Sequence, residues 1–166
     1  MSAAQPKLNA ATRRILALAA VIFALDQFTK WLVLREIVEG DEHVIIPGFF
    51  NLAHRVNTGA AWSMFTGAST VLALLAAGTL LAVFLWRRQL GLRQPAAQMA
   101  FGLLCGGIVG NLTDRLVHGH VIDFIDLHFG SYVYPTFNVA DSGICVGVFG
   151  YILWSLRQPA AGNSSP

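Results

Sequence analysis

Charged residues are scarce in this chain of 166 residues: Asp, Glu, Lys and Arg make up 12% of it, whereas hydrophobic residues make up 55%. Soluble domains usually carry about 25% charged residues. This chain lacks the charge that a water-soluble globule or a disordered segment needs, and the positive charge that meets nucleic-acid phosphates. The composition excludes these classes and predicts a small integral membrane protein, in agreement with a mean hydropathy of +0.57.

Acidic residues are missing from three segments in which Lys and Arg gather. Residues 1–14, residues 87–95 and the tail after residue 156 hold seven positive charges and no Asp or Glu. The intervening segments 35–69 and 113–138 each carry a net charge of −2. Because Lys and Arg accumulate on the cytoplasmic side, this alternation predicts that both termini are cytoplasmic and that the two acidic loops lie outside.

Cysteine is scarce as well. Cys105 and Cys145 both fall within apolar stretches, which is typical of small buried residues rather than of a disulfide framework. His118, His120 and His128 lack the spacing of a helical zinc pair. The sequence also has no phosphate-binding glycine loop and no serine nucleophile motif. We therefore expect neither a metal nor a cofactor.

Long apolar stretches alternate with the charged segments. A helix of about 20 apolar residues crosses a bilayer, so these stretches predict an all-α integral membrane protein with four transmembrane helices in a single membrane-embedded domain, residues 1–166. The first stretch contains Asp26 and Lys30 and is too long for a secretory signal core, which favours a retained helix. The predicted spans are about 15–34, 70–86, 96–112 and 139–156.

The two outer loops contain β-branched and aromatic runs. Residues 44–56 include a Pro-Gly break, and residues 121–137 are interrupted by Gly-Ser. Such runs predict short strands in turn-rich or irregular elements. Because backbone amides cannot face lipid unpaired, these elements should rest at the outer membrane boundary. The candidates for an aromatic belt at this boundary are Trp62, Tyr132 and Tyr134.

Two charged residues interrupt the first span. Asp26 and Lys30 lie four apart on one helix face, which fits either an ion pair whose charges snorkel outward or a functional proton or substrate group. We favour the structural pair. Glycines spaced by four in the third span predict close helix packing and no catalytic role. They are Gly102, Gly106 and Gly110.

Polar residues also gather where the third span ends. Asp114 is disfavoured at the negative end of a helix, so it needs a cation, and Arg115 and Lys30 are the candidates. Asn111 lies deeper and needs hydrogen-bond partners. A structural polar network and a substrate-binding network fit these residues equally well.

Two further carboxylates stand at the predicted outer boundary. Asp123 has apolar neighbours, so desolvation should raise its pKa, whereas Asp126 fits a solvated loop acid. Asp141 follows Asn138 at the start of the fourth span, where it fits a capping box. Asp141 would also lie level with Asp123. Two such carboxylates share one proton in aspartic proteases, one acting as base on water and the other as acid on a carbonyl.

Five motifs in order carry a resemblance to a known family. They are Asp26-Gln-Phe-Thr-Lys30, Asn57-Thr-Gly-Ala-Ala-Trp-Ser63, Gly110-Asn111-Leu-Thr-Asp114-Arg115, Val121-Ile-Asp123-Phe124 and Phe137-Asn138-Val-Ala140-Asp141. From about residue 15 to residue 156, the chain resembles the lipoprotein signal peptidases (signal peptidase II). The resemblance implies a bacterial inner-membrane aspartic endopeptidase, which removes the signal peptide from prolipoproteins by cleaving before a Cys that carries diacylglycerol.

The resemblance also implies roles for individual residues. It makes Asp123 and Asp141 the catalytic pair, with the active site at the periplasmic face. Its implied partners are the diacylglyceryl-prolipoprotein and membrane lipid, without a nucleic acid, and we favour a monomer. The residues implied to contact the substrate or hold the pair are Asn57, Asn111, Arg115, Asn138 and Ala140. Those implied to support the structure are Asp26, Lys30 and Asp114.

A small transporter or channel subunit is the competing class. Asp26, Lys30, Asp114 and Asp141 would then form an ion or proton path. The acids gather at one end of the spans rather than across them, however, and the spans show no evident inverted repeat. A purely structural membrane partner would explain the glycines but would leave the Asn, Asp and Arg residues without a role.

Overall fold

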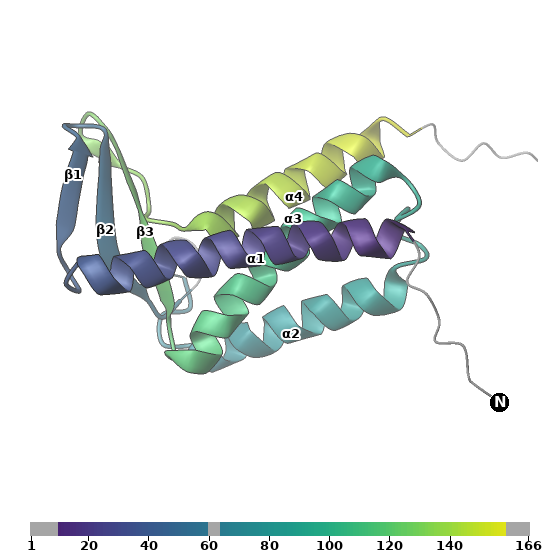
Figure 1. The fold of residues 1–166 in the computed structure, drawn as a ribbon, viewed down its shortest axis with the longest axis horizontal. Coiled ribbons are helices and arrows are strands. Elements are labelled where there is room, and N and C mark those ends of the chain that lie inside the picture. Colours follow the sequence, from purple (N-terminus) through teal and green to yellow (C-terminus); the bar gives the residue numbers. More distant parts are fainter. Residues whose placement is uncertain (1–9, 60–63, 159–166) are drawn as a thin grey trace, which may run out of the picture.

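The computed structural model describes residues 10–59 and 64–158. Four helices in it are long and apolar enough to cross a membrane, as predicted. They form a bundle that carries a small sheet at one end (Figure 1). The helices are α1 (Ala10–Glu36), α2 (Ser69–Trp86), α3 (Pro95–Val117) and α4 (Val139–Leu156).

Helix α3 continues beyond the apolar span of about 96–112 and ends at Val117. Asp114 and Arg115 therefore lie in its last turns. From there Asp114 contacts Lys30 of α1, and Arg115 donates to the carbonyl oxygen of Gly59 after β2.

Helix α3 is the central helix of the bundle, with α1 and α4 packed against it and α2 packed on its side. The packing is close because glycines line the contacts. A Cβ at Gly106 would lie 2.7 Å from the carbonyl oxygen of Ala19 in α1, and one at Gly107 would lie 2.3 Å from that of Ala140 in α4. The predicted packing role of the glycines is confirmed, and it extends to both neighbours of α3.

The two outer loops together form one antiparallel sheet in the order β1-β2-β3-β4. The sequence predicted strands in each loop, but not the long-range pairing of β2 with β3 that joins the loops. The sheet is attached to α1 through Val33, which packs in a buried cluster with Ile122 and Phe124. Its strands are β1 (Glu42–Ile46), β2 (Phe50–Asn57), β3 (Val121–Phe129) and β4 (Tyr132–Val133).

The Pro-Gly break forms the tight turn between β1 and β2. Phe49 N–H donates to the carbonyl of Ile46 at 3.0 Å, and Gly48 has a φ of 73°. Proline followed by a residue with positive φ is the pattern of a type II turn, in which glycine is free of strain.

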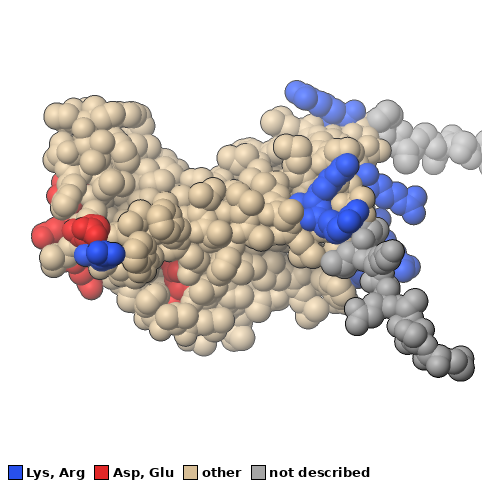
Figure 2. Space-filling view, viewed as in Figure 1, with Lys and Arg blue, Asp and Glu red and all other residues tan. Residues whose placement is uncertain are grey.

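The two ends of the bundle differ in charge. The start of α1 and the end of α4 lie together at the end opposite the sheet (Figure 1). Lys and Arg cluster at that end, whereas most of the visible acidic side chains lie at the sheet (Figure 2). The charge alternation of the sequence is therefore a separation in space.

Two of the smaller predictions are tested by these residues. Cys105 is half-buried, but Cys145 is exposed, so the prediction that both are buried is wrong for Cys145. Its side of α4 borders a cavity rather than α3. Tyr132 and Tyr134 are exposed on and beside the sheet, whereas Trp62 lies outside the described residues.

Candidate active site

A buried ion cluster lies where α1 and α3 meet below the sheet. Lys30 Nζ contacts Asp26 Oδ2 at 2.8 Å and Asp114 Oδ2 at 2.7 Å, and it donates to Asn111 Oδ1 at 3.0 Å. An ammonium group has three N–H donors, so these three acceptors satisfy it. The predicted pair of Asp26 and Lys30 is present, and Lys30 is the cation that Asp114 requires.

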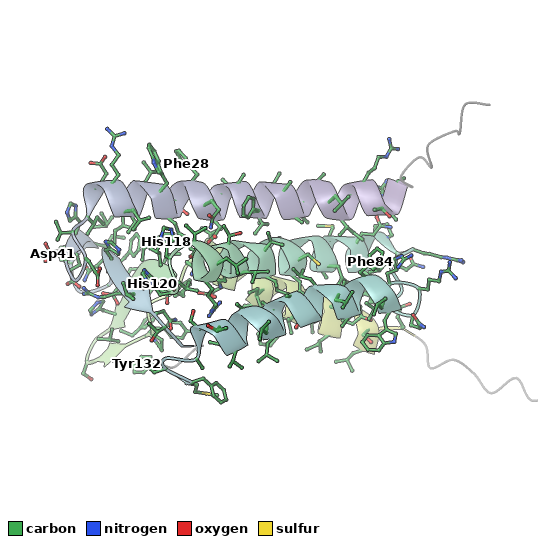
Figure 3. The ribbon with its side chains drawn as sticks, turned by 90° about the horizontal axis from the view of Figure 1, so that it is seen from below. Phe28, Asp41, Phe84, His118, His120 and Tyr132 are labelled. Atoms are coloured by element: carbon green, nitrogen blue, oxygen red, sulfur yellow. The ribbon has the colours of Figure 1, made fainter. Side chains whose placement is uncertain are left out.

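The prediction that this pair snorkels outward is wrong. Asp26 is 0% and Lys30 2% exposed, because both face α3. Phe28, between them in sequence, points away from the bundle instead (Figure 3). A buried ion pair needs further hydrogen bonds to offset its desolvation, and the surrounding residues supply them.

These further hydrogen bonds come from an amide side chain and two backbone groups. Gln27 Nε2 donates to Asp26 Oδ2 at 3.1 Å and to Asp114 Oδ1 at 2.9 Å. Ala140 N–H donates to Asp26 Oδ1 at 2.9 Å, and Ile122 N–H donates to Asp114 Oδ2 at 3.2 Å. The cluster therefore joins α1, α3, the start of α4 and β3. It holds the site together rather than facing a ligand.

Asp123 lies on β3, and among the residues that the structure describes its hydrogen-bond donors are side-chain amides. Asn57 Nδ2, from the neighbouring strand β2, donates to Asp123 Oδ2 at 2.8 Å. Asn138 Nδ2 donates to Asp123 Oδ1 at 2.7 Å. The pairing of β2 with β3 thus brings one donor to the carboxyl group, and the start of α4 brings the other. The Asp123 side chain is 3% exposed.

Asp141 lies in the first turn of α4, within hydrogen-bond reach of the same asparagine. Asn138 is the N-cap of α4: its Oδ1 accepts from Asp141 N–H at 2.9 Å, and its own N–H donates to Asp141 Oδ2 at 3.2 Å. The predicted capping box is confirmed. Because Asn138 also binds Asp123, the same residue starts the helix and connects the two carboxyl groups.

Asn111 connects the ion cluster to these carboxyl groups. Its Oδ1 accepts from Lys30 and, at 3.2 Å, from Asn138 Nδ2. The opposite end of the amide, Nδ2, therefore points at Asp141 and donates to Oδ1 at 2.7 Å. Lys30 fixes which way round this amide lies, because an ammonium group only donates hydrogen bonds.

Arg115 lies beside the same carboxyl groups without forming an ion pair within the described residues. Its guanidinium donates to the carbonyl oxygens of Gly59, at 2.9 Å, and Asn111, at 3.3 Å. It thereby holds the segment after β2 against α3. Neither catalytic candidate has a cation in direct contact within the described ranges 10–59 and 64–158.

A cavity of about 770 Å³ opens beside the two carboxyl groups. Asp123 and Asp141 both line it, as do Asn57, Asn111 and Arg115. Asn138 and Ala140 are fully buried behind this wall. Much of the remaining wall is apolar, and it comes from β2, β3, α4 and the segment between β4 and α4. The apolar lining residues include Val56, Leu127, Phe129, Phe137, Ile144 and Val146.

Burial raises the pKa of the Asp123 carboxyl to about 7, with the negative charge of Asp141 as the next cause. The amides of Asn57 and Asn138 act in the opposite direction, because they bind the ionised form. The prediction that desolvation raises this pKa is in agreement with the structure. At a pH near 7 the Asp123 carboxyl is therefore divided between its protonated and ionised forms.

Asp126 differs from its predicted role. It was expected to be a solvated acid, but it is 4% exposed. His128, two residues along the same strand, contacts it at 2.7 Å, and side chains two apart lie on one face of a strand. Asp126 does not line the cavity, so its burial does not place it in the candidate site.

The histidines do not form one group. His118 and His120 lie close to each other near the end of α3 (Figure 3), with ring centroids 5.9 Å apart. His128 belongs to the sheet and pairs with Asp126. Among the residues that the structure describes, no three His, Cys, Asp or Glu side chains are placed to hold a metal ion.

The structure thus brings together every predicted site residue at one end of the bundle. The motif that begins at Asn57 includes residues 60–63, which lie outside the described part of the chain. Gln27 was missed by sequence reasoning, although a polar amide inside an apolar span was a usable signal. The apolar lining of the cavity was missed as well, because nothing distinguishes it in sequence from ordinary core.

The sequence matches a known protein family over most of its length. A model of the signal peptidase (SPase) II family matches residues 18–157. The chain belongs to the signal peptidase II family. The match covers most of α1, the whole of α2, α3 and α4, and the sheet.

Individual relatives agree with this membership. The lipoprotein signal peptidase of Symbiobacterium thermophilum is 41% identical over 134 residues, covering 81% of this chain and 87% of that protein. The one from Xanthomonas axonopodis pv. citri is 39% identical over 161 residues, covering 89% and 92%. A solved bacterial membrane enzyme superposes with a TM-score of 0.83 at 30% identity, covering 98% of this chain and 99% of that one. The protein is therefore a multi-pass membrane peptidase of bacterial type.

Proposed function

We propose that this chain is an aspartic endopeptidase that removes the signal peptide from diacylglyceryl-modified prolipoproteins, cleaving before the lipid-bearing Cys. The observation that carries the proposal is the pair formed by Asp123 and Asp141. Both carboxyl groups are bound by amides rather than cations, both contact Asn138, and both line one largely apolar cavity. The names of the family relatives support the same substrate class.

In this proposal the two carboxyl groups share one proton. The ionised group takes a proton from water while the water oxygen bonds to the scissile carbonyl carbon. The protonated group donates a hydrogen bond and then its proton to the carbonyl oxygen. As the C–N bond breaks, the amine leaves with the proton first taken from water. One hydroxyl of the diol intermediate then returns its proton to the carboxyl group that donated one, which gives the carboxylic acid product and leaves the pair with one proton again. Asn57, Asn111 and Asn138 hold both groups in place throughout.

The cavity fits the proposed substrate in its polarity and position. A lipid-modified Cys next to an apolar signal helix brings acyl chains and apolar side chains to the membrane surface, and the apolar wall of the cavity can bury them. Arg115 and Gly59 bring a charged group and backbone to the same cavity. By the positive-inside rule, the termini are cytoplasmic and the site lies at the periplasmic face.

Cleavage of a synthetic diacylglyceryl peptide by the purified protein tests the proposal. We expect a single cut before the modified Cys, identified by mass spectrometry. Asp123→Asn and Asp141→Asn should each lower kcat by about 10⁴-fold, because the two residues act as one unit. Asp126→Asn is the matched control: it changes a buried aspartate on the same strand, outside the cavity, and should retain activity.

Three results would contradict the proposal. They are full activity in either dyad variant, an equal loss in Asp126→Asn, or proton flux through liposomes from a protein that cleaves no peptide. The last result would favour a transporter, in which the boundary carboxylates carry ions.

A further inference from the structure

A second cavity lies at the end of the bundle opposite the sheet. Its volume is about 590 Å³. One wall is the beginning of α1, and the other is the segment that connects α2 to α3. The lining residues are Ala11, Thr12, Ile15, Arg87, Arg88, Leu92 and Arg93. The cavity thus combines three guanidinium groups with small and apolar side chains.

No carboxylate is available to neutralise these arginines. The sequence has no Asp or Glu before residue 26, between residues 43 and 113, or after residue 141. Arg87 is held by its own helix, through the carbonyl and ring of Phe84. The space-filling view shows the basic side chains of this end grouped together, without acidic neighbours on the visible face (Figure 2).

The segment that carries the arginines is fixed to the bundle. Gln98, which is 4% exposed, donates from Nε2 to the carbonyls of Leu92 and Arg93 at 3.0 and 3.2 Å. Its Oε1 accepts from Arg14 of α1 at 3.5 Å. Gly91 sits so close to Trp154 of α4 that a Cβ would lie 2.5 Å from the indole ring. Both walls of the cavity are therefore held in place before any ligand binds.

Lys and Arg are expected at the cytoplasmic ends of the helices of any membrane protein, but they need not line the same cavity. Here three arginines surround one cavity. Guanidinium groups bind phosphate with paired hydrogen bonds. The cavity lies where membrane-spanning helices end, at the depth of lipid headgroups, and basic pockets of this kind bind acidic headgroups.

We propose that this cavity binds the headgroup of an anionic phospholipid. The phosphate would lie between Arg88 and Arg93, and the glycerol and first acyl carbons would lie against Ile15 and Leu92. This site is separate from the dyad and does not depend on the peptidase proposal.

Native mass spectrometry of the purified protein in a neutral detergent tests the proposal, with phosphatidylglycerol and phosphatidylcholine as the added lipids. We expect one retained phosphatidylglycerol per chain. Arg88→Gln/Arg93→Gln should bind it about thirtyfold more weakly. Arg13→Gln/Arg157→Gln is the matched control, because it removes two charges from the same end of the bundle outside the cavity, and it should bind as the unmodified chain does.

A second pair of variants separates cavity shape from charge. Ala11→Trp fills the cavity and leaves every charge in place, so it should abolish retention of the lipid. Ala10→Trp adds the same side chain one residue earlier, outside the cavity lining, and should not. If the arginine variant fails to fold, as shown by its thermal unfolding, this pair still decides the question.

The outcomes that overturn the proposal are distinct. Equal retention of phosphatidylcholine would show that the negative charge of the headgroup is not recognised. Equal losses in the two arginine variants would show that only general surface charge acts. Displacement of the lipid by inorganic phosphate at millimolar concentration would show that the site takes a free anion instead.

Discussion

Two pairs of aspartates lie at the same end of this bundle, and they differ in what neutralises them. Asp26 and Asp114 share the ammonium group of Lys30, and both side chains are buried. Asp123 and Asp141 are nearly as buried but receive hydrogen bonds from asparagine amides, and they border a cavity. Aspartate thus occurs here once with its charge balanced by a cation and once without a contacting cation among the described residues. Asn111 contacts both groups, through Lys30 and Asp141.

This difference indicates a structural role for Asp26 and Asp114 and is consistent with the chemical role proposed for Asp123 and Asp141. A carboxylate that contacts a buried cation has its charge balanced by that cation, and removing either partner leaves a buried charge unpaired. A carboxylate held by neutral amides can take up a proton, and burial favours that change. Replacing a charged residue of the Lys30 cluster with a neutral one should therefore lower the free energy of unfolding. Replacing Asp123 or Asp141 with a neutral residue should leave that free energy unchanged or raise it, but should abolish activity.

The largest stability effect is expected from Lys30→Met. Removing the ammonium leaves two buried carboxylates facing each other, and the loss of one partner of a buried ion pair costs about 3–5 kcal/mol. Asp123→Asn, by contrast, should not lower the unfolding free energy. Denaturant unfolding in detergent measures both. Arg35→Met, which removes an exposed pair with Glu36, is the control and should change stability by less than about 1 kcal/mol.

The second effect is the pH dependence that Asp123 contributes. Its pKa rises from 3.8 to about 7 on folding, so the folded state binds this proton more tightly than the unfolded state. Stability from this group is therefore present below pH 3.8 and is lost as pH rises to about 7. The loss amounts to a few kcal/mol, at about 1.4 kcal/mol for each unit.

Comparing unfolding of the unmodified chain and of Asp123→Asn between pH 4 and pH 8 isolates this contribution. The variant should be favoured increasingly as the pH rises. A difference between the two proteins that is constant over this range would mean that Asp123 has an ordinary pKa.

A smaller effect is expected where the two pairs of aspartates are packed together. A Cβ at Gly110 would lie 2.5 Å from Asp26 Oδ2 and 3.2 Å from the Cβ of Ala140. Gly110→Ala should therefore lower the unfolding free energy by about 1–3 kcal/mol, as overpacking does. Gly150→Ala is the control on α4, because a Cβ there meets nothing within 4 Å. It should be neutral or slightly stabilising. Equal stability of the two variants would argue against the tight contact.

The smallest effect concerns the amide of Asn57. It donates to Asp123 Oδ2 and favours the ionised form, so Asn57→Ala should move the Asp123 pKa upward, by about one unit at most. In a dyad that shares one proton, activity falls when the second proton is lost. The alkaline limb of kcat/KM should therefore lie near pH 7 in the unmodified chain and at higher pH in Asn57→Ala. An unchanged limb would assign that ionisation to another group.

Much of this arrangement could be predicted from sequence because it rests on local patterns. Hydropathy located the four spans, and the four-residue spacing of Asp26 and Lys30 predicted their contact. The Asn138–Asp141 spacing likewise predicted the capping box. These features depend on residues a few positions apart, where backbone geometry alone decides which side chains meet.

The features that were missed depend on long-range pairing. The register that sets Asn51 opposite Asp126 and brings Asn57 to Asp123 follows from β2 pairing with β3, which local propensity does not specify. Asp126 was misjudged because its burial comes from that sheet. Its partner His128 was detectable, since alternate residues of a strand share a face. The choice of Lys30 rather than Arg115 as the partner of Asp114 likewise required the packing of α1 on α3.

The position of Asn138 has a consequence for how the protein is made. Asp123, Asn57 and Asn111 all precede α4 in the chain, whereas Asp141 lies on this last helix and Asn138 immediately before it. During synthesis the earlier helices can enter the membrane and pair with one another while the dyad is still missing half of its members. Docking of α4 then completes the helix cap and the proposed catalytic pair in one step. Under that proposal, a chain whose α4 has not docked cannot cleave a peptide.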